Sequence, residues 1–150
     1  MRRERREGRL RRCFVDTSAY FALTNDHDAS HPVARSLLTR LADHQTHLFT
    51  TNDVIAETRA LLLNRLNRSI ARAFLEQLYE HSSTTIVRVS VRDEQRARQI
   101  IATYTDKDFT FTDATSFAVM ERLRIGHAFT FDDDFRQYGF TTLTPQLLAS

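Results

Sequence analysis

The sequence predicts a single α/β domain with a mainly parallel sheet. Short apolar or β-branched segments alternate along the chain with longer segments whose apolar residues recur at helical spacing. About five strands separated by helices fit this alternation, which is typical of parallel sheets because each crossover needs a connecting helix. The 150 residues, of which 41% are hydrophobic and 27% charged, suit one folded domain. We assign this domain to residues 13–150.

Charge and hydropathy divide the chain into a basic leader and a domain without membrane segments. Residues 1–12 contain seven arginines and two glutamates, a net charge of +5, so the remaining residues carry −3 of the total of +2. We expect this leader to be a flexible, solvated extension, and contact with nucleic-acid phosphates is the alternative. No apolar run approaches the ~20 residues that span a bilayer, and no signal peptide is recognisable. We therefore expect a cytoplasmic protein without membrane contact.

The first strand and helix form the stretch from Cys13 to Leu23. An apolar run ends at Asp16, and Thr17 and Ser18 are hydroxyl residues suited to begin a helix. Asp16 on its own fits a helix cap, but it also stands where open parallel sheets bind ligands, at the carboxyl end of a strand. We expect this strand to be central and the cap to be Thr17 or Ser18.

The later elements follow from the same patterns. Predicted helix-starting residues are Asn52 or Asp53, Ser69 and Thr112. We expect helices over 32–41, 54–65, 69–82, 92–104 and 113–120, strands over 47–51, 84–89, 125–131 and 140–143, and a short turn or helix over 135–139.

A glutamate lies on the apolar face of the helix predicted over 54–65. Val54, Glu57 and Leu61 stand at i−3, i and i+4, so they share one side of the helix. A carboxylate on a core-facing side costs free energy unless it is paired or binds a metal. The ordinary alternatives are a salt bridge to an arginine, or an edge position that reaches water.

Two further acids repeat these arrangements. Asp113, Phe117 and Met120 stand at i, i+4 and i+7, so Asp113 shares the buried face of its helix. The alternative is that Asp113 only complements the helix dipole. The strand over 125–131 ends on Asp132–Asp134, which repeats the geometry of the first strand.

Together these acids predict a metal site. Right-handed crossovers bring the strand ends to one edge of the sheet, where Asp16, Glu57, Asp113 and Asp132 would meet. Clustered carboxylates repel one another, so they are stable together only if they are protonated or neutralised by cations, and ligand sets made only of oxygen favour Mg²⁺ or Mn²⁺. One or two such ions suit the hydrolysis of phosphodiesters.

The ordered acidic motifs resemble those of the PIN-domain ribonucleases, particularly the small VapC-type toxins of bacterial toxin–antitoxin pairs. The resemblance extends over residues 13–143 and rests on Phe14-Val15-Asp16-Thr17-Ser18, Glu57, Thr112-Asp113-Ala114 and Thr130-Phe131-Asp132-Asp133-Asp134-Phe135. It implies a three-layer α/β/α fold with five parallel strands, Mg²⁺-dependent endonucleolytic cleavage of RNA, a homodimer and inhibition by a cognate antitoxin. The arginine-rich leader departs from the family pattern.

The resemblance also assigns roles to residues. Catalytic and metal-binding positions are Asp16, Glu57, Asp113 and Asp132. Residues expected to support these ligands are Thr17, Thr130 and Asp134, and residues considered for contact with RNA are Arg59, Lys107 and Arg136.

Three other functions fit less well. A haloacid-dehalogenase-like phosphatase needs a second aspartate two residues after Asp16, where this chain has Ser18. A receiver domain needs a lysine after a late strand, and the only lysine, Lys107, precedes the third acidic motif. The remaining alternative is a catalytically silent PIN fold that only binds RNA or a protein, against which the presence of all four acids counts.

Overall fold

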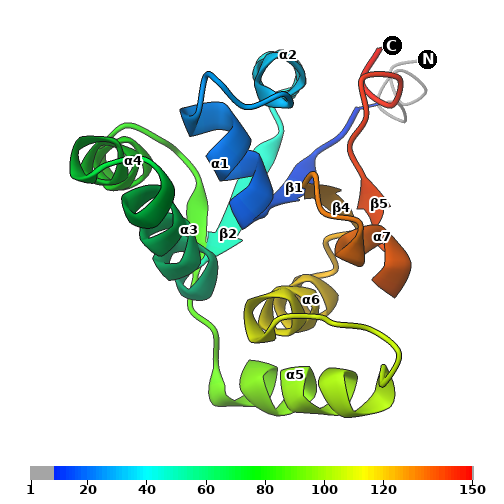
Figure 1. The fold of residues 1–150 in the computed structure, drawn as a ribbon. Helices are drawn as coiled ribbons and strands as arrows, with labels where there is room; N and C mark the ends of the chain where they lie inside the picture. The colour runs from blue at the N-terminus through cyan, green and yellow to red at the C-terminus, as the bar shows by residue number, and fades with distance from the viewer. Residues whose placement is uncertain (1–8, 150) are drawn as a thin grey trace, which may run out of the picture.

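The computed structural model describes residues 9–149, in which helices cover both faces of a five-stranded parallel sheet (Figure 1). The strands are β1 (Arg12–Val15), β2 (His47–Thr51), β3 (Thr85–Val87), β4 (His127–Phe129) and β5 (Thr141–Thr142). The helices are α1 (Thr17–Thr24), α2 (His31–Asp43), α3 (Asn52–Arg65), α4 (Arg68–Glu80), α5 (Val91–Thr103), α6 (Phe111–Leu123) and α7 (Asp134–Tyr138). The predicted fold class is therefore confirmed.

The strand order is β3-β2-β1-β4-β5, and every neighbouring pair is parallel. The first strand is thus central, as predicted, and the last strand is at an edge. Phe14 of β1 pairs with Phe49 on one side and with Ala128 on the other. Because all strands run in the same direction, their carboxyl ends lie along one edge of the sheet.

Strand β1 contributes to a separate core on each face of the sheet. Phe14 points into a core with residues of α5, α6 and α7, while Cys13 and Val15 point into a core with residues of α1 and α2. All three side chains are buried. A strand between two helical layers is apolar at every position, which explains why this segment lacks the alternation of a half-exposed strand.

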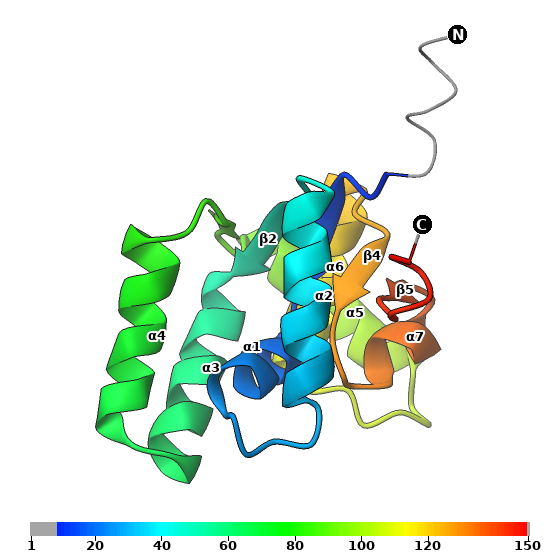
Figure 2. The ribbon, with the colours of Figure 1, turned by 90° about the horizontal axis from the view of Figure 1, so that it is seen from above.

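Helices α3 and α4 form an antiparallel pair that packs beside α1 (Figure 2). A third core lies between these helices, built from Ile55, Leu62, Ala71, Phe74 and Leu78. Helix α3 begins at Asn52, directly after the end of β2, so its first turns lie at the carboxyl edge of the sheet. This is how Glu57 comes near the residues that follow β1.

The helix caps differ from the prediction by one to two residues. Each observed cap accepts a hydrogen bond from a backbone N–H two or three residues further on. Several polar residues stand together at each helix start, and their order alone does not reveal which one keeps an extended backbone. The observed caps are Asp16 instead of Thr17 or Ser18, Thr51 instead of Asn52 or Asp53, Asn67 instead of Ser69, and Thr110 instead of Thr112.

Residues 9–12 differ from the flexible stretch expected of them. Arg12 begins β1, and its guanidinium donates hydrogen bonds to the carbonyl oxygens of Leu123 (2.9 Å) and Arg124 (2.8 Å) at the end of α6. The hydroxyl of Thr46 donates to the carbonyl oxygen of Leu10 at 2.7 Å. These contacts hold the segment to the domain. Residues 1–8 of the expected extension lie outside the described residues.

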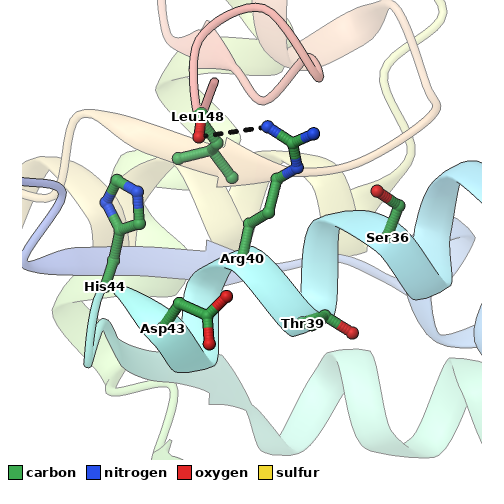
Figure 3. A pocket seen from close by; sticks show the side chains of 6 residues that line it. All are labelled: Ser36, Thr39, Arg40, Asp43, His44 and Leu148. Atoms are coloured by element: carbon green, nitrogen blue, oxygen red, sulfur yellow. Dashed lines mark hydrogen bonds between the residues drawn. The ribbon is translucent and has the colours of Figure 1, made fainter. Parts of the chain in front are cut away.

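A surface hollow of about 630 Å³ lies between α2 and the C-terminal turn (Figure 3). Within it, Nη1 of Arg40 donates a hydrogen bond to the carbonyl oxygen of Leu148 at 3.3 Å, which fastens the C-terminal turn to α2. The hollow is lined by residues of α2, by His44 and by Leu148, and it contains a single carboxylate, that of Asp43. It is therefore separate from the acidic edge. In residues 9–149 we find no helix with the length and apolarity to span a membrane.

Candidate active site

Asp16 directly follows β1 at the centre of the carboxyl edge. Its Oδ2 accepts hydrogen bonds from the hydroxyls of Ser18 and Thr130, both at 3.0 Å, and from the backbone N–H of Ser18 at 3.4 Å. The side chain is only 3% exposed, and this burial raises its pKa to about 6, although the hydrogen bonds oppose the rise. Asp16 is therefore a helix cap and a strand-end carboxylate at once.

Asp113 is fixed at the start of α6 by a reciprocal cap. The backbone N–H of Thr110 donates to Oδ2 of Asp113 at 3.1 Å, and the N–H of Asp113 donates to the hydroxyl of Thr110 at 3.0 Å. Asp113 is 6% exposed, and Phe117 and Met120 on the same helical face are fully buried, which confirms the predicted inward orientation. Burial, the neighbouring carboxyl of Asp134 and the charges of Asp16 and Asp132 raise the pKa of Asp113 to about 8.

Asp113 meets two acids from the segment after β4. Carboxylate oxygens of Asp113, Asp132 and Asp134 lie within 4.8 Å of one another, and we call these three residues the carboxylate cluster. The N–H of Asp134 donates to Oδ1 of Asp132 at 3.1 Å, which orients the two side chains together. Burial and the nearby carboxylates also raise the pKa of Asp134. Asp134, expected only to support the ligands, is thus a member of the group.

Asp133 is turned away from the carboxylate cluster. Both of its oxygens accept hydrogen bonds from the guanidinium of Arg136, at 2.7 and 2.9 Å, and this pairing lowers its pKa. Three consecutive aspartates therefore divide into two members of the cluster and one surface ion pair. This division makes Asp133 a matched control for its neighbours.

Glu57 lies at the margin of the acidic edge. The hydroxyl of Thr17 donates to Oε2 of Glu57 at 3.4 Å, which links it to the residue after Asp16. Glu57 does not belong to the carboxylate cluster, and among the described residues it makes no ion pair with an arginine. Of the four predicted acids, Asp113 and Asp132 are thus in direct proximity, Asp16 is near enough to raise the pKa of Asp113, and Glu57 is further out.

The hydroxyls of Ser18 and Thr130 connect the residues that follow β1 to the residues that follow β4. Oγ of Ser18 and Oγ1 of Thr130 are 3.0 Å apart, and the N–H of Asp132 donates to Oγ1 of Thr130 at 3.0 Å. Thr130 was predicted to support the acids, whereas Ser18 was considered only as a cap. In the sequence, Ser18 is recognisable only as a hydroxyl residue two positions after a strand-end acid. Hydroxyl residues are common at helix starts, so this pattern does not distinguish a cap from a residue that orients Asp16.

The predicted RNA-contacting residues have different surroundings. Arg59 is exposed on α3, and Arg136 is held by Asp133. Lys107 lies within 3.8 Å of Asp106 and close enough to Asp133 to help lower its pKa. Two of the three cations therefore lie near Asp133, the aspartate outside the carboxylate cluster.

The donor set fits a divalent cation. Three carboxylates with oxygens within 4.8 Å of one another can surround one ion, and within residues 9–149 none of the three makes an ion pair with a basic side chain. Oxygen ligands suit hard cations. The carboxylate cluster and Asp16 are accordingly the described residues best arranged to hold a metal.

The profile of the PIN domain family matches residues 13–141. The chain belongs to the PIN-domain family. This PIN domain is 36% identical over 137 residues to the 23S rRNA-specific endonuclease VapC20 of Mycobacterium tuberculosis, a match that covers 89% of this chain and 98% of that protein. It is 27% identical over 113 residues to a VapC ribonuclease of Archaeoglobus fulgidus, covering 74% of this chain and 71% of that protein.

Solved structures agree with the assignment of this PIN domain. The crystal structure of M. tuberculosis VapC20, described as a sarcin–ricin loop cleaving toxin, superposes with a TM-score of 0.82 and 34% identity, covering 89% of this chain and 99% of that one. FitAcB from Neisseria gonorrhoeae superposes with a TM-score of 0.62 and 15% identity, covering 89% of this chain and 98% of that one. At 15% identity, the similarity to FitAcB supports the fold assignment only.

Proposed function

We propose that this PIN domain is a Mg²⁺-dependent endoribonuclease and the toxin of a toxin–antitoxin pair. The observation that carries the proposal is the carboxylate cluster beside Asp16, at the carboxyl edge of a PIN-domain sheet. The relationship to VapC proteins named as ribonucleases supports the same activity.

Asp113, Asp132, Asp134 and Asp16 are the proposed ligands of the ion, and Glu57 is a candidate for a second ion. Mg²⁺ is the proposed resident ion, and Mn²⁺ should substitute because both are hard cations that accept oxygen ligands. When bound, the ion supplies positive charge for the phosphate oxygens and lowers the pKa of an attacking water.

The remaining residues of the edge orient these ligands. The hydroxyls of Ser18 and Thr130 hold Asp16 and the segment after β4 in one arrangement. The reciprocal cap with Thr110 holds Asp113, and the N–H of Asp134 holds Asp132. Such fixed ligands reduce the reorganisation needed when the charged phosphate arrives.

We propose the sarcin–ricin loop of 23S ribosomal RNA as the substrate. The support is the VapC20 relative, which is named for 23S rRNA and whose structure is described as that of a sarcin–ricin loop cleaving toxin. A loop is also where RNA bases become accessible to proteins. Arg59, Lys107 and Arg136 are candidates for contact with the RNA backbone.

We further propose that the protein acts in the cytoplasm as a homodimer and is inhibited by a cognate antitoxin. These proposals rest on the family resemblance and on the VapC relatives. Light scattering of the purified protein tests the dimer. Co-purification with the product of a neighbouring reading frame, followed by loss of RNA cleavage, tests the antitoxin.

The cleavage experiment uses a hairpin with the sarcin–ricin sequence, a hairpin with a scrambled loop, and Mg²⁺, Mn²⁺ or EDTA. We expect cleavage of the first hairpin with either metal and none with EDTA. Asp16→Asn should abolish cleavage, whereas Asp133→Asn, which alters a carboxylate outside the cluster, should retain it. Binding of the hairpin without cleavage under every condition would instead favour the silent binding module.

A further inference from the structure

Two phenylalanines are exposed beside the acidic edge. The chain has 11 phenylalanines, and among the described residues only Phe111 (46% exposed) and Phe131 (39% exposed) count among the exposed large apolar side chains. Phe131 directly precedes Asp132, and Phe111 lies two residues before Asp113. Each exposed phenylalanine therefore lies within two residues, along the chain, of a member of the carboxylate cluster.

Phe131 is held in place by its backbone. Its N–H donates to the hydroxyl of Ser18 at 2.9 Å, and the residues on either side of it are tied together by the bond from the N–H of Asp132 to Thr130. Its ring meets the buried ring of Phe129 edge-on, with centroids 6.1 Å apart. The same hydroxyls that orient Asp16 therefore fix the position of an exposed aromatic ring.

Phe111 is positioned by the start of α6. It is the first residue of α6 and directly follows Thr110, which forms the reciprocal cap with Asp113. The ring is therefore carried by the same helical turn that presents the Asp113 carboxylate.

The surroundings of the two rings favour a planar, polar-edged ligand over an apolar protein surface. Phe131 is followed by three aspartates, and Phe111 stands between two threonines. Among the described residues the rings of Phe111 and Phe131 do not pack against each other, so they do not form the continuous apolar patch that protein interfaces bury. Aromatic rings near a phosphate-binding site instead suit nucleobases, because every base offers a face for stacking.

We propose that Phe131 and Phe111 are base-stacking residues, which hold the unpaired nucleotides next to the scissile phosphate. This inference rests on the proposed ribonuclease function and adds how the substrate is positioned. The carboxylate cluster would act on the phosphate, while the two rings select RNA whose bases are free to leave the helical stack. Stacking of this kind strengthens binding by roughly 5- to 150-fold per base, independently of base identity.

The test measures RNA binding in Asp113→Asn protein, which should not cleave the RNA during the measurement. The probe is a sarcin–ricin hairpin with 2-aminopurine in its loop, whose fluorescence falls when an aromatic ring stacks on it. We expect Phe131→Leu to weaken binding by roughly 5-fold or more and to abolish the fluorescence change. Phe131→Tyr should retain both, and Phe111→Leu should reduce both.

Tyr79 provides the matched control, since it is 59% exposed on α4 and belongs to a different surface. Tyr79→Leu should bind RNA like its parent. Equal binding and equal fluorescence in Phe131→Leu and its parent would overturn the inference while leaving the ribonuclease function intact. A change of oligomeric state in Phe131→Leu would also overturn it, by making the ring part of an interface. Failure of the wild type to cleave RNA would overturn the proposed function itself.

Discussion

Replacing Asp113 with asparagine should stabilise the fold in the absence of metal. The pKa of Asp113 is raised from an ordinary value of 3.8 to about 8 because the carboxyl is buried among other acids. Folding therefore disfavours its ionised form. Asparagine has nearly the same shape, carries no charge, and retains an oxygen that can accept the hydrogen bond from Thr110.

The size of the effect follows from the pKa shift. Because the folded-state pKa of Asp113 lies above the unfolded one, the contribution of this group to stability is fully present below pH 3.8 and is lost as the pH rises through about 8. One proton of difference lowers the free energy of unfolding by about 1.4 kcal/mol per pH unit in that window. At pH 7 the accumulated loss in the wild type has an upper limit of about 4 kcal/mol, and Asp113→Asn removes it.

Urea unfolding in EDTA at pH 5, 6, 7 and 8 measures this dependence. Asp113→Asn should show a shallower fall in stability with pH than the wild type, and Asp133→Asn should follow the wild type. Excess Mg²⁺ should stabilise the wild type, by about 2.7 kcal/mol at 100 times the dissociation constant, and should not stabilise Asp113→Asn to this extent. Parallel pH profiles for wild type and Asp113→Asn would refute the reasoning.

Two further predictions concern the contacts that hold the edge and the first strand. Thr130→Val should lower the cleavage rate by roughly 10- to 100-fold, because Asp16 loses a hydrogen bond that orients it, whereas Thr130→Ser should restore it. An unchanged rate in the valine variant would contradict this role. Arg12→Gln should lower the free energy of unfolding by about 1–2 kcal/mol, because the guanidinium bonds to the end of α6 are lost. The exposed Arg11, whose side chain makes no hydrogen bond to residues 9–149, supplies the control Arg11→Gln, and equal stability of the two variants would contradict this account.

The central strand and the inward acids were predictable because their signals are local. The apolar run before Asp16 and the helical spacing of Asp113, Phe117 and Met120 each determine which way a side chain points. Parallel strand direction then brings these acids to one edge. For these residues, sequence patterns were sufficient to predict the arrangement that the structure shows.

Other features depend on contacts that no local pattern contains. Two of the three consecutive aspartates belong to the carboxylate cluster. Which two they are depends on where α7 begins and on the pairing of Asp133 with Arg136. The order of residues 9–12 depends on Arg12 reaching the end of α6, 111 residues further along the chain. The role of Ser18 depends on the approach of Thr130, which only the assembled sheet produces.

The most direct test of the account is the single-turnover cleavage rate of Asp113→Asn on the sarcin–ricin hairpin in Mg²⁺. We expect this variant to be at least as stable as the wild type without metal and yet to cleave at least about 100-fold more slowly, because it lacks a ligand of the ion. Cleavage at the wild-type rate would contradict the claim that the carboxylate cluster is the catalytic centre.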